Sequence, residues 1–287
     1  MSMHVADTYI GNKSENDAIE RRVQSEGYKT VAVTDDQRRR SRFRTTAEDG
    51  TEIGVVVGRE LQAGDVLSDG EMYVVVTLES GVLWLHIAAG VVALLAGATA
   101  LATTKGGPRH RRAGKTFVWA MAVVVGTVLP LLVIDPTSTR VFLTLVAVFS
   151  GYLAFSGYRV LSRKRPADGD AAVDWVAAGL VVAACLALGG WGVRRLLGGD
   201  PFGVVLVVFG GIGVAFGGVD ARSFRAGGGE PEWTVTHLTR MVAALIATVT
   251  AVSAVNLTML PDVVAWLWPT VAGSLLIAYY ANRYGSG

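Results

Sequence analysis

The chain has 287 residues, of which 51% are hydrophobic and 17% charged, whereas soluble domains average about 25% charged residues. This composition excludes an ordinary soluble enzyme. The charge is uneven, since residues 1–80 carry 15 acidic and 10 basic side chains while residues 81–287 carry 9 and 16. A single cysteine, Cys185, excludes an internal disulfide and a cysteine-built zinc or iron–sulfur site. The sequence therefore predicts a polar head followed by a multi-span membrane domain.

The head begins with a polar segment and continues as short strands. Residues 1–28 lack the apolar core of a signal peptide and are predicted to form a flexible arm with a short helix near Asp17–Ser25. In residues 29–80, Asp49-Gly50 separates two strand-like runs and predicts a type I′ hairpin, while Gly54 predicts a bulge. We expect a small all-β domain with strands at 30–34, 42–47, 51–57 and 73–78. Its predicted core comprises Val31, Val33, Phe43, Ile53, Val55, Val57, Leu61, Val66, Leu67 and Val75.

Several motifs in this region share an order with one known family. They are the basic strand Arg38–Arg44, Asp49-Gly50, Gly54, Arg59 and the closing Gly64-Asp65-Val66-Leu67. Over about residues 30–78 the sequence resembles the N-terminal domain of the urease accessory protein UreE. The resemblance implies a β-sandwich that binds protein partners. It implies no nickel ligands, because the second UreE domain with its metal-site histidine does not follow, and the segment between Arg59 and Gly64 is short for the family.

The basic strand of the head has two interpretations. Arg38, Arg40, Arg42 and Arg44 alternate, so they are expected on one solvated face, which either has no partner or docks a protein or an anionic lipid surface. No aromatic residues are interleaved in the manner of a nucleic-acid site, and the head is net acidic, which argues against nucleic acid as a partner.

The rest of the chain, residues 81–287, is predicted to be an all-α transmembrane domain of seven helices in the lipid bilayer. Each apolar segment has about the 20 residues needed to cross the hydrocarbon core. The segments are 82–104, 116–134, 141–161, 173–193, 201–219, 237–260 and 262–281. In the fifth segment, Gly213 and Gly217 form a small-residue face that either packs against another helix of the chain or makes a homodimer.

The distribution of Lys and Arg predicts the orientation of a multi-pass protein in the cell membrane. Thirteen basic residues lie in the loops or helix ends on one side, for example at Lys105–Lys115, and three lie on the other. Since basic loops stay in the cytoplasm, the C-terminus is predicted to be cytoplasmic and the N-terminal head to be outside. UreE-type proteins are cytosolic, so the location of the head stays open.

The membrane segment also resembles a predicted multi-pass family of unknown function. The residues that carry this resemblance are His86–Gly90, Lys105–Gly107, His110–Lys115, Trp119–Met121, His237–Met241, Asn256 and Trp266–Thr270. The resemblance implies a fold and no chemistry.

Three histidines are candidates for function, because ionisable groups within membrane segments are costly. His86 is predicted near the outer end of the first span, and His110 and His237 near the inner end, where each is either a functional group or an interfacial hydrogen-bonding residue. A haem with two histidine ligands needs matched depth, which His86 does not share with the other two. A divalent metal is a second cofactor hypothesis.

A polar cluster is predicted at the cytoplasmic end of the spans. Asp220, His237, Arg240 and His110 are expected at similar depth, as a lock between helices or as the mouth of a solute pathway. H-E-x-x-H, G-x-S-x-G and P-loop motifs are missing. The sequence therefore favours a non-enzymatic membrane protein that handles a small solute or metal and carries a docking or regulatory head. A membrane-anchored accessory factor for urease or nickel-centre assembly and a haem-binding redox protein are the alternatives.

Overall fold

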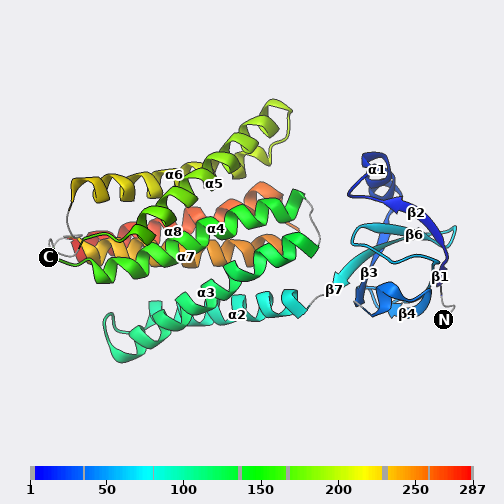
Figure 1. Ribbon diagram of the computed structural model, residues 1–287, viewed down its shortest axis with the longest axis horizontal. Coiled ribbons are helices and arrows are strands. Elements are labelled where there is room, and N and C mark those ends of the chain that lie inside the picture. Colours follow the sequence, from blue (N-terminus) through cyan, green and yellow to red (C-terminus); the bar gives the residue numbers. More distant parts are fainter. Residues whose placement is uncertain are drawn as a thin grey trace. The chain divides into compact units, whose positions relative to one another are not determined.

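The computed structural model describes residues 4–34, 36–79, 81–134, 138–165, 169–227, 232–257 and 259–285. The chain divides into two compact units, Met1–Trp84 and Leu85–Gly287, which are described separately (Figure 1).

The head contains two sheets among its described residues. One has the order β1-β5-β4, from β1 (His4–Ala6), β5 (Glu52–Val56) and β4 (Arg42–Thr46). The other has the order β2-β6-β7-β3, from β2 (Thr8–Asn12), β6 (Asp65–Ser68), β7 (Tyr73–Glu79) and β3 (Tyr28–Thr34). The pairs β1–β5 and β3–β7 are parallel. Helix α1 (Asp17–Glu26) and the 3-10 helix η1 (Gln37–Arg39) complete the unit. The two sheets confirm the predicted β fold of the head.

The alternation of residues along β7 explains how the head is packed. Val74 and Val76 join one core cluster with Val31, Val33, Ile53 and Val55. Tyr73 and Val75 face the opposite side and pack with Val23 of α1. Because successive strand residues point to opposite faces, an apolar run such as Tyr73–Val76 buries both faces of its sheet at once.

Residues 4–26 do not form the flexible arm that the sequence predicted. β1 pairs with β5, β2 pairs with β6, and α1 is capped by Asn16, whose side-chain oxygen accepts a hydrogen bond from the Ala18 amide at 3.0 Å. The prediction of the helix was right. The arm prediction failed because these strands are short and polar, and their stability comes from partners about 50 residues away along the chain.

The Asp49-Gly50 hairpin is present, but its turn is not type I′. Gly50 has φ +86°, while no non-glycine residue in the described part of the chain has positive φ. Ala47 N–H donates to Thr51 O at 2.8 Å, which closes a three-residue loop with Gly50 in the left-handed position. The predicted bulge at Gly54 is also wrong, because β4 and β5 stay in continuous register there and the irregularity lies in β2, between Tyr9 and Gly11.

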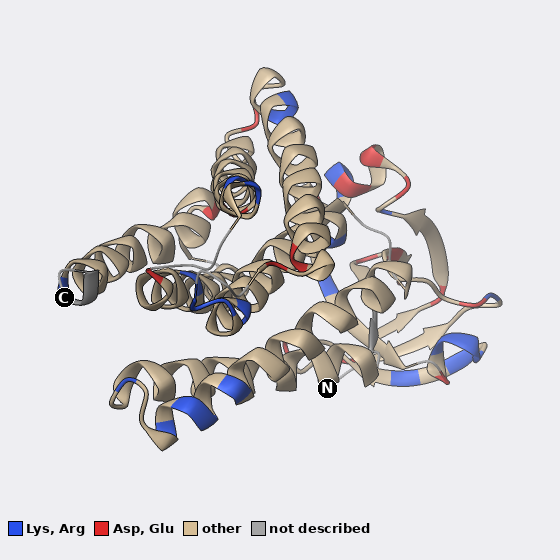
Figure 2. Ribbon diagram, turned by 60° about the vertical axis from the view of Figure 1, so that its left-hand side comes forward, with Lys and Arg blue, Asp and Glu red and all other residues tan. Residues whose placement is uncertain are grey.

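Within the described residues, the second unit has seven helices that are long and apolar enough to cross a membrane, as the sequence predicted. They are α2 (Gly81–Ala102), α3 (Pro108–Ile134), α4 (Ser138–Arg159, extended by the 3-10 helix η2, Val160–Ser162), α5 (Ala172–Leu197), α6 (Gly203–Ala226), α7 (Trp233–Asn256) and α8 (Asp262–Gly285). Most Lys and Arg residues of this unit lie near helix ends or in loops (Figure 2). Leu95, Leu180 and Leu275 are exposed on the helix surfaces, where lipid would cover them.

Glycines set the distance between α5 and α6. A Cβ at Gly210 would lie 2.7 Å from the carbonyl oxygen of Cys185, and one at Gly217 would lie 2.7 Å from a methyl of Val182. Gly213 lies against the Cys185 side chain. The Gly213/Gly217 face is therefore occupied by α5 of the same chain, as in the intramolecular alternative, and gives no support to a homodimer through this face.

Candidate functional site

Asp220 and Arg240 join α6 and α7 inside the helical unit. Arg240 Nη2 donates to Asp220 Oδ1 at 2.6 Å. The Arg240 side chain is only 4% exposed and the Asp220 side chain 9% exposed. The Tyr152 hydroxyl of α4 donates to the second carboxylate oxygen of Asp220. The Arg240 guanidinium also lies 4.2 Å from the ring centre of Phe216. The three polar residues therefore connect α4, α6 and α7 through one buried unit.

The two histidines expected in this cluster form a separate pair. Their ring centres are 6.5 Å apart in an edge-to-face arrangement. His237 Nδ1 lies 2.7 Å from Gly157 O, and His110 Nδ1 lies 2.9 Å from Ala100 O. A carbonyl accepts only, so each Nδ1 carries the hydrogen and each Nε2 is left as the second ring nitrogen. The predicted cluster thus splits into an ion pair and a histidine pair.

One residue of α4 links the two halves. A Cβ added at Gly157, whose carbonyl accepts from His237, would lie 2.8 Å from the Cβ of Arg240. Gly157 of α4 therefore contacts both His237 of the histidine pair and Arg240 of the ion pair.

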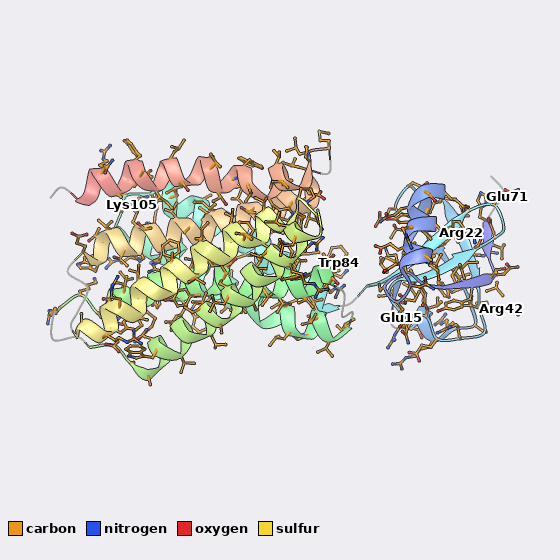
Figure 3. The ribbon with its side chains drawn as sticks, turned by 90° about the horizontal axis from the view of Figure 1, so that it is seen from above. Glu15, Arg22, Arg42, Glu71, Trp84 and Lys105 are labelled. Carbon is orange, nitrogen blue, oxygen red and sulfur yellow. The ribbon has the colours of Figure 1, made fainter. Side chains whose placement is uncertain are left out.

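The histidine pair borders a cavity of about 450 Å³ between α2, α3, α7 and the end of α4. Most of its wall is apolar, with Leu101, Phe117 and Leu238 among the contributors. Three cations also line it: Lys105, Arg111 and Lys164. Figure 3 shows Lys105 at one end of the helical unit, outside the spans, and partial burial lowers the pKa of its ammonium group. This cavity therefore combines an apolar wall with histidine and cationic side chains.

A second ion pair, between a buried aspartate and a partly exposed arginine, was not predicted from the sequence. Arg159 of α4 donates from Nε and Nη2 to the two carboxylate oxygens of Asp174 of α5, at 2.9 and 2.8 Å. Arg163, itself buried, lies with its guanidinium 4.8 Å from the ring centre of Phe224. The available signal was a lone aspartate in the first turn of an apolar segment, 15 residues after an arginine at the end of the preceding one.

His86 lies away from this site. Its Nδ1 is 2.8 Å from the Thr127 hydroxyl, which belongs to α3. Thr127 follows His110 by 17 residues in the same helix, which is about 25 Å along the axis. His86 therefore cannot share a ligand with the histidine pair. Among the described residues, no group of three or more His, Cys, Asp or Glu side chains suited to a metal ion is found.

The four head arginines do not lie on one strand face. Arg42 and Arg44 point outward from β4, and Arg42 lies at the outer surface of the head (Figure 3). Arg38 belongs to η1 and pairs with Glu60 at 3.1 Å, while Arg40 pairs with Asp36. The prediction of one alternating face was wrong, because a 3-10 turn interrupts the run before the strand begins.

The closing Gly64–Leu67 motif of the head has a structural role. Asp65 is buried, accepting from the Asn12 side-chain amide at 3.0 Å and from the Gln62 backbone amide at 2.8 Å. Gly64 has φ +84° and delivers Asp65 into β6. Arg59 lies 4.0 Å from the ring centre of Tyr9, a residue of β2. These residues hold β2 against β6 and so stabilise the fold.

Comparison with known proteins gives a family match within the first unit. Residues 6–78 match the family model of the N-terminal domain of the UreE urease accessory protein, which confirms the resemblance drawn from the motifs. No curated protein and no solved structure matched the chain. The chain therefore joins a UreE-type N-terminal domain to helices that are long and apolar enough to form a multi-pass membrane domain.

Proposed function

We propose that the helical unit is a membrane domain that binds a small solute in the cavity beside His110 and His237, and that the head docks a protein partner. The observation that carries this proposal is the cavity itself, which combines an apolar wall with convergent polar groups. Its volume of about 450 Å³ is in the range of small-molecule sites.

The packing around the cavity supports a binding role. α2 approaches α7 closely at Gly97, where a Cβ would lie 2.6 Å from a methyl of Leu245. At Gly114, also in the cavity wall, no described atom lies within 4 Å of an added Cβ. The cavity wall is thus tightly packed at Gly97 and has free space at Gly114.

Cysteine reactivity tests whether small solutes enter. In a Cys185→Ala background, Gly114→Cys is compared with Gly126→Cys, a position in the same helix outside the cavity with equal free space for a side chain. In lipid nanodiscs, we expect the cysteine at 114 to react with the neutral reagent 2-hydroxyethyl methanethiosulfonate at least about tenfold faster, since a thiol reacts only where water reaches it. Equal, slow reaction at both positions would refute the proposed function.

A second candidate function rests on the family match of residues 6–78. In this alternative the chain anchors urease or nickel-centre assembly at the membrane, and the exposed Arg42 and Arg44 contribute to docking. Co-purification of urease accessory components with the full chain, and loss of that association in Arg42→Glu/Arg44→Glu, would support it. Failure to recover any urease component from cells that express both would refute it.

A further inference from the structure

We propose that the cavity takes an amphiphilic anion, a single carboxylate or phosphate group on an apolar chain. This inference rests on the proposed function and names the chemical class of the solute.

The charge of the cavity is the first argument. Lys105, Arg111 and Lys164 line it, and no Asp or Glu among the described residues does. In the part of the chain that the structure describes, none of these three cations is in an ion pair with a carboxylate. Lys164 Nζ instead lies 4.1 Å from the ring centre of Trp233, which also lines the cavity. Cations that have no carboxylate partner beside an apolar surface favour an anion.

The helix ends add to the same potential. The first turn of α3 contributes His110 and Arg111 to the wall, and the first turn of α7 contributes Trp233 and Thr234. Helix N-termini carry partial positive charge. The opposite, negative end of α2 is already capped, since Lys105 Nζ donates to Leu101 O at 2.6 Å and His110 Nδ1 to Ala100 O at 2.9 Å. Two positive helix ends thus reach the cavity while the carbonyl end is satisfied.

The rest of the wall suits an apolar chain. Leu101, Phe117, Leu238 and Leu245 line the cavity between the helices. A divalent metal fits less well, because the two histidines are accompanied by three cations and, among the described residues, by no carboxylate ligand. The source of the anion is either a bilayer lipid or a soluble organic acid, and the two share the chemistry recognised here.

Protection of a cysteine at 114 measures binding in the full chain. The Cys185→Ala/Gly114→Cys protein is placed in phosphatidylcholine nanodiscs and labelled with the neutral thiosulfonate in the presence of dodecanoate, dodecyl phosphate or dodecanol. We expect the two anions to slow labelling at least about fivefold, and dodecanol at equal bilayer content to slow it less than about twofold, since only the anions gain charge-assisted contacts.

Two double variants with the same change in net charge supply the control. Arg111→Gln/Lys164→Gln removes cations of the cavity wall, whereas Arg109→Gln/Arg112→Gln removes neighbours on the first turns of α3 that do not line it. Protection by dodecanoate should require about tenfold more anion in the first variant and remain unchanged in the second. Equal losses in both would overturn the inference, because they would reflect the charge of the membrane surface alone.

The outcomes separate the two proposals. If dodecanol protects as well as the anions, the inference is overturned and the cavity remains a solute site of another class. If the cysteine at 114 does not react at all, the proposed function itself fails. If nanodiscs containing phosphatidylglycerol protect the cysteine and dodecanoate adds nothing further, the amphiphilic anion is a bilayer lipid. If dodecanoate protects equally in both nanodiscs, it is a soluble acid.

Discussion

Arg240 Nη2 of α7 donates a hydrogen bond to Asp220 Oδ1 of α6 at 2.6 Å, and both side chains are buried inside the helical unit. Burying two charges is costly, so the pair persists because each neutralises the other and Tyr152 occupies the remaining carboxylate oxygen. The pair therefore links α6 to α7, and removing either member leaves the other buried without its opposite charge.

A double-mutant cycle should reveal this coupling. Asp220→Asn and Arg240→Gln are each expected to cost about 3 kcal/mol in detergent, while the double variant should cost about 2 kcal/mol less than the sum of the two. Thermal unfolding of the purified proteins measures the effect. His86→Ala serves as the control and should be additive with either change, because its partner Thr127 lies far along α3. Additivity between Asp220 and Arg240 would show that they are energetically independent.

The stability of the chain should be sensitive to loss of the Asp174 charge, even in a variant that keeps the shape of this side chain. The Asp174 side chain is 2% exposed, so Asp174→Asn is expected to destabilise the chain by about 3 kcal/mol. Asp200→Asn is the matched control at the exposed pair with Arg195, where the loss should stay within about 1 kcal/mol. Similar unfolding temperatures for the two variants would contradict the assignment of a buried pair.

The hairpin of the head should depend on one glycine. Gly50 has φ +86°, so Gly50→Val forces a β-branched residue into the left-handed region at a cost of about 1 kcal/mol or more. In the full chain, the β4 and β5 amides should exchange hydrogen about fivefold faster. Gly58→Val is the control, because Gly58 has no positive φ and an added Cβ meets no described atom within 4 Å. An equal effect at both positions would mean that bulk, and not backbone conformation, is the cause.

Acid should loosen the head through Asp49. Hydrogen bonds from Lys29 and Thr51 lower the pKa of this carboxyl from 3.8 to about 2. A depressed pKa means that the interaction stabilises the fold above pH about 4 and is lost as the pH falls through 2. Pepsin cleavage of the head should therefore rise across this window in the wild type and change less in Lys29→Met. Lys13→Met, whose ammonium lies 5.4 Å from the Tyr28 ring centre, should behave as the wild type.

The charge bias predicts the side of the membrane. Gly107→Cys in a Cys185→Ala background should resist an impermeant thiol reagent in intact cells and react after the cells are opened, because the loop at Lys105–Lys115 is expected in the cytoplasm. Labelling of intact cells at this position would reverse the orientation. The external loop predicted at Asp135–Arg140 lies partly outside the described residues, so Arg194→Cys at the same predicted side is the better control.

The sequence alone determined the division into two units, the number of long apolar helices within the described residues, and four strands of the head, β3, β4, β5 and β7, but not β6. These features depend on local quantities, namely segment length, hydropathy and alternation, which a single stretch of chain carries by itself. The common depth of Asp220 and Arg240 was also predictable, because position within a spanning helix fixes depth at 1.5 Å per residue.

Only the tertiary structure decided which residues meet at that depth. His237 contacts Gly157 and not Asp220, and Arg159 pairs with Asp174. Helix rotation and tilt determine which side chains face each other, and the hydropathy of a single helix encodes neither of them. The strand β1 likewise owes its existence to β5, and Gly217 finds its neighbour in α5 and not in a second chain. The cavity beside His110 depends on how α2, α3, α7 and the end of α4 pack, since it is the space that these segments leave between them.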